Sequence, residues 1–105
     1  MATRLGEKIH ELRKQQKLTL DALSEKAGLS KSYIWELENR ESQRPSVEKL
    51  TALADALGVA VSYFIEEEIN APEERHIDEA FYRSYKKLDV EAKEQIRKIL
   101  HTFKK

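Results

Sequence analysis

Two short segments with capping signals, residues 20–27 and 30–39, most constrain what this chain can fold into. Thr19 and Ser30 each precede apolar residues at helical spacing, and a hydroxyl there can accept a hydrogen bond from a backbone N–H of the first turn. Gly28 follows the first segment, and glycine tolerates the left-handed backbone with which many helices end. The sequence therefore predicts two short helices joined by a turn of about three to four residues, a helix-turn-helix pattern.

The second predicted helix, residues 31–39, has one apolar side and one polar side. Ile34 and Leu37 are three residues apart and should point into a core. The opposite side carries an amine, a hydroxyl, a carboxylate and two aromatic rings, from Lys31, Ser32, Glu36, Tyr33 and Trp35. Such a face suits base edges and phosphates, and it suits solvent equally well. This helix alone does not distinguish a nucleic-acid interface from a solvated surface.

Three further helical patterns lie between residues 3 and 65. We expect side-chain caps at Thr3, Ser46 and Ser62, and we expect Gly58 to close the helix that Ser46 begins. The apolar positions of these patterns are Leu5, Ile9 and Leu12, then Val47, Leu50, Leu53, Ala54 and Leu57, then Tyr63, Phe64 and Ile65. With the two helices above, they predict an all-α domain of five helices over residues 1–65.

The pattern changes after Ile65. Residues 66–72 begin with three glutamates and end at Pro72, which disrupts a helix, so we expect a linker. Residues 73–105 predict a helical hairpin whose second helix is capped by Asp89. About 30 residues cannot bury a wide apolar face alone, so the hairpin needs a partner: a second copy, the chain's own fifth helix, or another protein. The predicted dimerisation residues are Phe81, Tyr85, Leu88, Ile96, Leu100 and Phe103.

Composition excludes several classes of protein. The chain has 19 basic and 19 acidic residues, so any affinity for nucleic acid must come from local placement of charge. It lacks cysteine, which removes thiol catalysis and cysteine-ligated zinc, and its three histidines, His10, His76 and His101, form no metal motif. No apolar run approaches a membrane span or a signal peptide. We expect a cytoplasmic protein that is not an enzyme and has no cofactor or metal.

Five ordered blocks carry a resemblance to a known family. They are IHELR at 9–13, LSEKAGLS at 23–30, YIWELEN at 33–39, PSVEKL at 45–50 and ADALGV at 54–59. Together they resemble the Cro/CI-type (XRE) family of bacterial and phage repressors, and several blocks at these separations are more specific than one motif. The resemblance implies a five-helix, lambda-repressor-like domain that binds operator DNA as a dimer, with the helix at 30–39 in the major groove.

The resemblance also implies which side chains contact DNA. Lys31, Ser32 and Glu36 match base-reading positions, where lysine suits guanine, glutamate suits cytosine and serine suits either, so we favour G·C steps in the half-site. Glu36 could equally be a surface carboxylate repelled by phosphate. Tyr33, like Trp35, would pack on a thymine methyl or a sugar, or would shield the domain edge. The expected phosphate contacts are Ser30, Asn39, Arg40 and Arg44.

Other family positions have structural consequences. Arg13 and Glu38 match a pair that holds the recognition helix on the first helix. Leu20 stands where the family has a glutamine that touches phosphate, which puts that contact in doubt. Arg40 stands where a glycine is frequent, so it must adopt a left-handed backbone or the helix must end differently.

These observations predict a sequence-specific transcriptional regulator, a dimeric repressor that binds an inverted-repeat operator. Activation stays open. An antitoxin that autoregulates its operon and neutralises a toxin is the alternative. The hairpin is similar in layout to that of compact repressors of the sporulation and biofilm type, so a protein antagonist or a toxin is a further possible partner.

Overall fold

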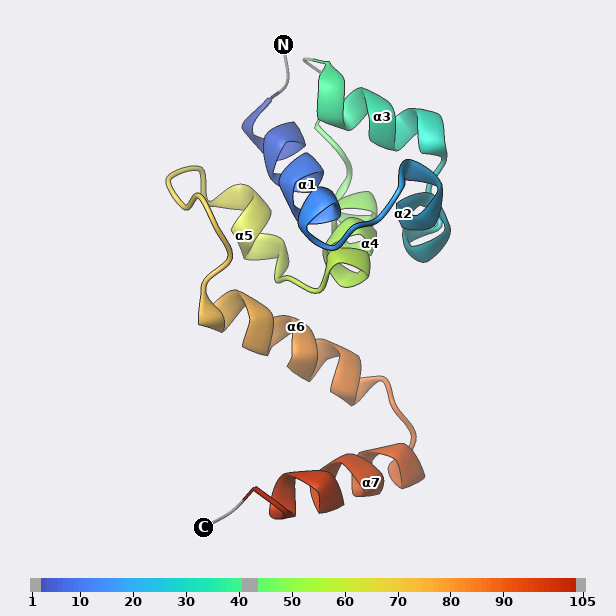
Figure 1. The fold of residues 1–105 in the computed structure, drawn as a ribbon, viewed down its shortest axis with the longest axis vertical. Coiled ribbons are helices and arrows are strands. Elements are labelled where there is room, and N and C mark those ends of the chain that lie inside the picture. The colour runs from blue at the N-terminus through green and yellow to red at the C-terminus, as the bar shows by residue number, and fades with distance from the viewer. Residues whose placement is uncertain (1–2, 41–43, 104–105) are drawn as a thin grey trace.

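The computed structural model describes residues 3–40 and 44–103, and these ranges form seven helices and no strand (Figure 1). The predicted all-α class is confirmed. The helices are α1 (Arg4–Gln15), α2 (Leu20–Ala27), α3 (Lys31–Asn39), α4 (Val47–Leu57), α5 (Val61–Ile65), α6 (Glu74–Lys86) and α7 (Val90–His101). No helix in the described ranges is both long and apolar enough to cross a membrane.

Local capping explains where most helices begin and end. Every predicted cap except one is formed, with the side chain accepting a hydrogen bond from the N–H three residues ahead: Thr3 from Gly6, Thr19 from Ala22, Ser30 from Tyr33, Ser46 from Lys49 and Asp89 from Ala92. Gly28 and Gly58 end α2 and α4 with left-handed φ angles of 68° and 72°. The boundaries of α1 to α4 are therefore set by residues close in sequence.

The exception is α5. The prediction that Ser62 caps this helix was wrong: α5 starts at Val61, after Ala60, and the Ser62 hydroxyl is buried without a hydrogen-bond partner among the described residues. The reason is tertiary, because the Ala60 N–H donates to the His76 carbonyl at 3.0 Å and the Tyr63 N–H donates to the Ala60 carbonyl at 3.1 Å. These bonds hold the chain in place and move the N-cap two residues towards the N-terminus, from the expected Ser62 to Ala60.

The core lies among α1 to α5. Its fully buried side chains include Ile9, Leu23, Ile34, Leu53 and Tyr63. Val47, which we predicted on the apolar stripe of α4, is instead 78% exposed because the first turn of α4 projects beyond this core.

α1 and α3 pack unusually closely. A Cβ atom at Gly6 would lie 2.1 Å from the carbonyl oxygen of Leu37, so any larger residue at this position would push α3 away from α1. The position of α3 therefore depends on the absence of a side chain at residue 6.

α6 docks on α4 and α5, whereas α7 extends away from the rest of the chain (Figure 1). His76 and Ala80 are the buried residues of α6. Arg83 donates to the Val59 carbonyl at 3.1 Å and pairs with Asp55 of α4. α7 has no buried residue within its described length and reaches α6 beside the turn, where the amine of Lys93 lies 5.6 Å from the centroid of the Tyr85 ring.

The segment between α5 and α6 is tied to the domain. Ile69 packs against the core, and the buried amine of Lys8 donates to the carbonyls of Tyr63 and Glu66. Burial lowers the pKa of Lys8, because it disfavours the charged amine. The Glu66 carboxylate also contacts Nε2 of His76 at 2.8 Å, so residues 66–72 form a structured connection to α6.

Candidate nucleic-acid interface

The outer face of α3 is free of protein contacts over most of its length. Ile34 and Leu37 are buried, as predicted. The exposed residues of the helix are Lys31, Ser32, Trp35, Glu36 and Asn39. Tyr33 differs from them because it is half-buried and packs against the core. The polar face is therefore available to a ligand, with Tyr33 at its margin.

A buried ion pair fixes α3 to α1. Arg13 Nε and Nη2 lie 2.8 and 2.9 Å from the two oxygens of Glu38, and the side chains are only 8% and 1% exposed. Arg13 also donates to the Leu18 carbonyl at 2.9 Å, and His10 Nδ1 lies 2.8 Å from Glu38. Every strong polar group of the pair thus has a partner, which a buried ion pair requires.

These contacts keep the pair charged. Burial alone would raise the pKa of Glu38, but hydrogen bonds with Arg13 and His10 outweigh it and hold this pKa below its usual range. The hydrogen bond with Glu38 raises the pKa of Arg13. Glu38 is therefore a carboxylate at neutral pH and its role is positioning, since it faces inward and away from any ligand.

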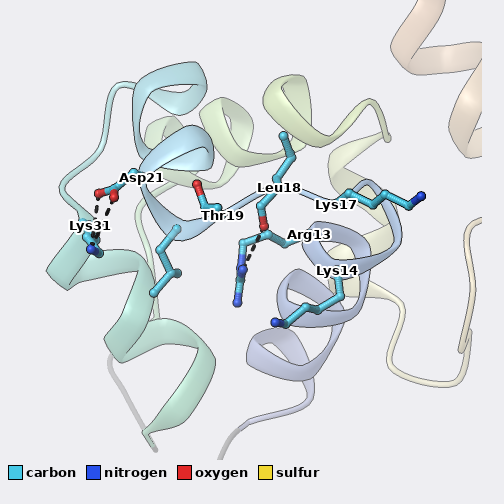
Figure 2. Close-up of a pocket in the computed structure, with 8 residues that line it drawn as sticks. Arg13, Lys14, Lys17, Leu18, Thr19, Asp21 and Lys31 are labelled. Carbon is cyan, nitrogen blue, oxygen red and sulfur yellow. Dashed lines mark hydrogen bonds and ion pairs between the residues drawn. The ribbon is translucent and has the colours of Figure 1, made fainter.

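A basic depression borders the N-terminal end of α3 (Figure 2). It is lined by the end of α1, the turn that follows and the starts of α2 and α3, with the residues Arg13, Lys14, Lys17, Leu18, Thr19, Leu20, Asp21 and Lys31. The pair between Lys31 and Asp21, at 3.4 Å, lies at one end and Lys17 at the other. Among the described residues, Lys14 and Lys17 form no ion pair, so both amines can take an external anion.

The backbone at the start of α2 also favours the binding of an anion in this depression. The N-terminus of an α-helix presents unpaired N–H groups and a partial positive charge, and α2 begins in the floor of the depression. Lys17 has a left-handed φ of 58°, the sharp bend that leads from α1 to this helix start. We did not predict Lys14 and Lys17 from the sequence. The available signal was the basic cluster at 13–17 directly before the Thr19 cap.

A second basic group lies on the other side of α3. The amine of Lys49, on α4, is 4.6 Å from the centroid of the Tyr33 ring, so the start of α4 borders α3 on its Tyr33 side. Arg44 is exposed just before the Ser46 cap. Residues 41–43 of the expected polar loop lie outside the described ranges. Lys49 is another cation that the sequence analysis missed.

The end of α3 resolves the question raised by Arg40. Arg40 is extended, with φ −122° and ψ 154°, so the helix ends without a left-handed residue. Its guanidinium lies 5.3 Å from the centroid of the Trp35 ring. Asn39 Nδ2 donates to the Trp35 carbonyl at 2.9 Å, and within the described ranges its side-chain oxygen accepts no hydrogen bond. Leu20 is half-buried against the core, so the glutamine contact of the family has no counterpart here.

No group of three or more histidine or acidic residues within 3–40 and 44–103 could hold a metal ion. What the structure does bring together is one exposed polar helix face between two groups of cations, Lys14 and Lys17 at the end of α1 and Arg44 and Lys49 at the start of α4. This arrangement fits a ligand that has anionic groups along both sides of a groove and hydrogen-bonding groups on the floor between them.

This architecture defines a helix-turn-helix domain, with α2 and α3 as the two helices of the motif. Residues 9–64 match the protein family described as helix-turn-helix, and the chain belongs to that family.

The chain is similar to known repressors. It is 41% identical over 97 residues to the immunity repressor protein of Bacillus phage phi105, covering 91% of this chain and 64% of the relative. It is 33% identical over 63 residues to the transcriptional regulator SinR of Bacillus subtilis, covering 60% of this chain and 57% of the relative. The chain thus spans less than two thirds of the length of each.

Two solved structures of SinR are also similar. The crystal structure of SinR, the master regulator for biofilm formation, in complex with DNA has a TM-score of 0.57 and 32% identity, and it covers 59% of this chain and 98% of that one. The structure of the SinR–SinI complex has a TM-score of 0.56 and 26% identity, covering 94% of this chain and 81% of that one. The second likeness extends over the C-terminal helices.

Glu38→Gln tests the positioning role of the pair. At pH 7 we expect this substitution to lower the free energy of unfolding by about 3–5 kcal/mol, because it leaves Arg13 buried without a counter-charge. The contribution of the carboxylate is complete above its unfolded pKa of about 4.3 and is lost as the pH falls towards the lower folded pKa. The difference between the two proteins should therefore shrink below about pH 4.

Urea unfolding between pH 7 and pH 3 measures this difference. Glu36→Gln, on the exposed side of the same helix, is the matched control and should unfold as the wild type does. Equal stability of wild type and Glu38→Gln at pH 7, or a difference that stays constant with pH, would contradict the assignment.

Proposed function

We propose that this protein is a transcriptional regulator that binds double-stranded operator DNA in a sequence-specific manner, with α3 in the major groove. The observation that carries the proposal is the exposed polar face of α3 between the cations at the end of α1 and those at the start of α4. The similarity to named repressors, and to SinR in complex with DNA, supports it. Those relatives are regulators, which also supports a function other than catalysis.

Base reading belongs to the side chains that α3 exposes. Lys31, Ser32 and Glu36 contact base edges, with lysine on guanine and glutamate on cytosine. Lys31 must first leave Asp21, which costs little because exposed ion pairs contribute little to stability. Tyr33 touches the outermost bases from the margin of the face.

Phosphates are bound on both sides of α3. One group consists of Lys14, Lys17 and Ser30 beside the start of α2. The other consists of Asn39, Arg40, Arg44 and Lys49 beside the start of α4. Because the net charge of the chain is zero, this local placement supplies the attraction to DNA.

Residues 73–105 assemble the regulator. Several large apolar side chains of α6, of α7 and of the turn after α7 are exposed, among them Phe81 (57%), Leu100 (55%) and Phe103 (77%). We assign them, with Tyr85, Leu88 and Ile96, to a homodimer contact. A dimer holds two copies of α3 about 34 Å apart, as reading of successive major grooves requires. Residues 1–65 then bind an inverted repeat in the cytoplasm, and 66–72 connect the two parts.

The same apolar residues can accept a different protein. The similar structure of SinR in complex with SinI supports such a partner for this region. An antagonist that binds there would compete with the homodimer and weaken DNA binding through loss of the second half-site.

Selection from random duplex DNA by the purified protein tests the function. We expect enrichment of an inverted repeat whose half-site centres are one helical turn, or a multiple of it, apart. Glu36→Ala should change the preference at one C·G step and leave the rest of the site unaltered. Retained sequences that show no common motif would refute sequence-specific binding.

Lys14→Ala and Lys17→Ala test the first phosphate group. Each phosphate contact contributes about 0.9 to the slope of log K against log salt concentration, so the double variant should reduce the slope by about 1.8 per subunit. Fluorescence anisotropy with the selected duplex at several salt concentrations measures the slope. Lys98→Ala, on exposed α7, is the control. An unchanged slope would remove both lysines from the interface.

Phe81→Ser combined with Leu100→Ser tests the dimer. We expect a monomer with unchanged helix content, because both side chains are exposed in the single chain and their polar replacements cost it little. Sedimentation equilibrium measures the mass, and Val47→Ser, at an exposed apolar position of α4, is the control. A double variant that stays as tight a dimer as the wild type would place the contact elsewhere.

A further inference from the structure

The DNA-facing side of the helix-turn-helix contains a notch with two apolar side chains, Leu20 and Trp35, that have no role in the function proposed above. It is lined by Leu20, Lys31, Ser32, Trp35 and Glu36. An α-helix turns by about 100° per residue, so Trp35 lies between Lys31 and Ser32 around the axis, one turn further along. Its ring therefore stands on the same face as two proposed base readers, and it is 42% exposed.

The guanidinium of Arg40 covers one face of the Trp35 indole, 5.3 Å from the ring centroid. Leu20, on the other wall, packs against the core. A rigid apolar wall loses little conformational entropy when a ligand enters.

The chemistry of the notch selects one feature of DNA. The leucine side chain has no hydrogen-bonding group, and the only apolar group on a base edge in the major groove is the C5-methyl of thymine. Neither the Leu20 nor the Trp35 side chain carries a charge, so these two walls do not provide a phosphate site.

We propose that Leu20 and Trp35 form a thymine-methyl site that specifies a T·A step in each half-site. The proposal rests on the function proposed above. Trp35 thus becomes a specificity-determining residue, and leucine at position 20 exchanges a polar contact for an apolar one. The half-site then contains a T·A step beside the G·C steps that Lys31 and Glu36 read.

Substitution of deoxyuridine for thymidine tests this directly, because it removes only the methyl group. With each thymidine of the selected operator replaced in turn, wild-type protein should bind about fourfold more weakly at one step per half-site, as expected for one buried methyl. Trp35→Ala and Leu20→Gln should bind the deoxyuridine and thymidine duplexes equally at that step. Val90→Ala, at an exposed apolar position of α7 away from the proposed DNA-binding surface, should keep the wild-type difference.

Trp35 is the only tryptophan of the chain, so its fluorescence gives a second measurement on the unmodified protein. The operator should shield it from quenching by acrylamide. A tryptophan that remains fully accessible in the complex would overturn the proposal, as would a deoxyuridine scan without a sensitive step, or a sensitivity that survives in both notch variants. A protein that retains no specific duplex at all would overturn the proposed function as well, and the two failures are therefore distinguishable.

Discussion

The buried pair of Arg13 and Glu38 is the interaction on which the candidate interface depends. Taking two charges out of water is costly, and the cost is offset here by two short hydrogen bonds between the partners and by further bonds to Leu18 and His10. The pair fixes the rotation of α3 about its axis. The missing side chain at Gly6 sets its distance from α1. Together they hold one face of α3 outward.

A second set of polar contacts joins this domain to the C-terminal helices. His76 is buried, and its Nδ1 accepts from the Glu73 N–H, so the hydrogen of the ring is on Nε2 and is donated to Glu66. Hydrogen bonds from Arg75 and His76 hold the pKa of Glu66 below its usual range. These contacts hold α6 against the domain, so that α6 is more than a helix connected to it by a flexible linker. A dimer formed through α6 and α7 would set the distance between two copies of α3 by rigid geometry.

Much of the fold could be predicted because it is specified locally. The caps at Thr3, Thr19, Ser30 and Ser46 each need only a hydroxyl and the next three residues. The errors have a tertiary origin: Ser62 is displaced by the bond between Ala60 and His76, and the environment of Val47 depends on where the core ends. The candidate site was predictable on α3 alone, since one helix face can be read from spacing.

The remainder of the site combines residues that are distant in sequence. Lys14 and Lys17 line the depression from the end of α1, and Lys49 reaches Tyr33 from α4. The basic cluster at 13–17 is visible in the sequence, but its position beside α3 depends on the tertiary fold. The chain's own fifth helix was one of the partners left open for the hairpin, but the residues that dock α6 were not predicted. We followed its apolar stripe, whereas the contacts come from His76, Ala80 and Arg83, two of which are polar residues on the opposite side.

The proposed DNA-binding surface consists of α3, the segment from the end of α1 to the start of α2, and the start of α4. Amide chemical-shift mapping of isotope-labelled protein, with and without its selected operator, tests it most directly. The largest changes in amide chemical shift are expected at residues 14–21, 30–40 and 44–49, and only small changes are expected in α7. Changes confined to α6 and α7, with an unperturbed α3, would contradict it.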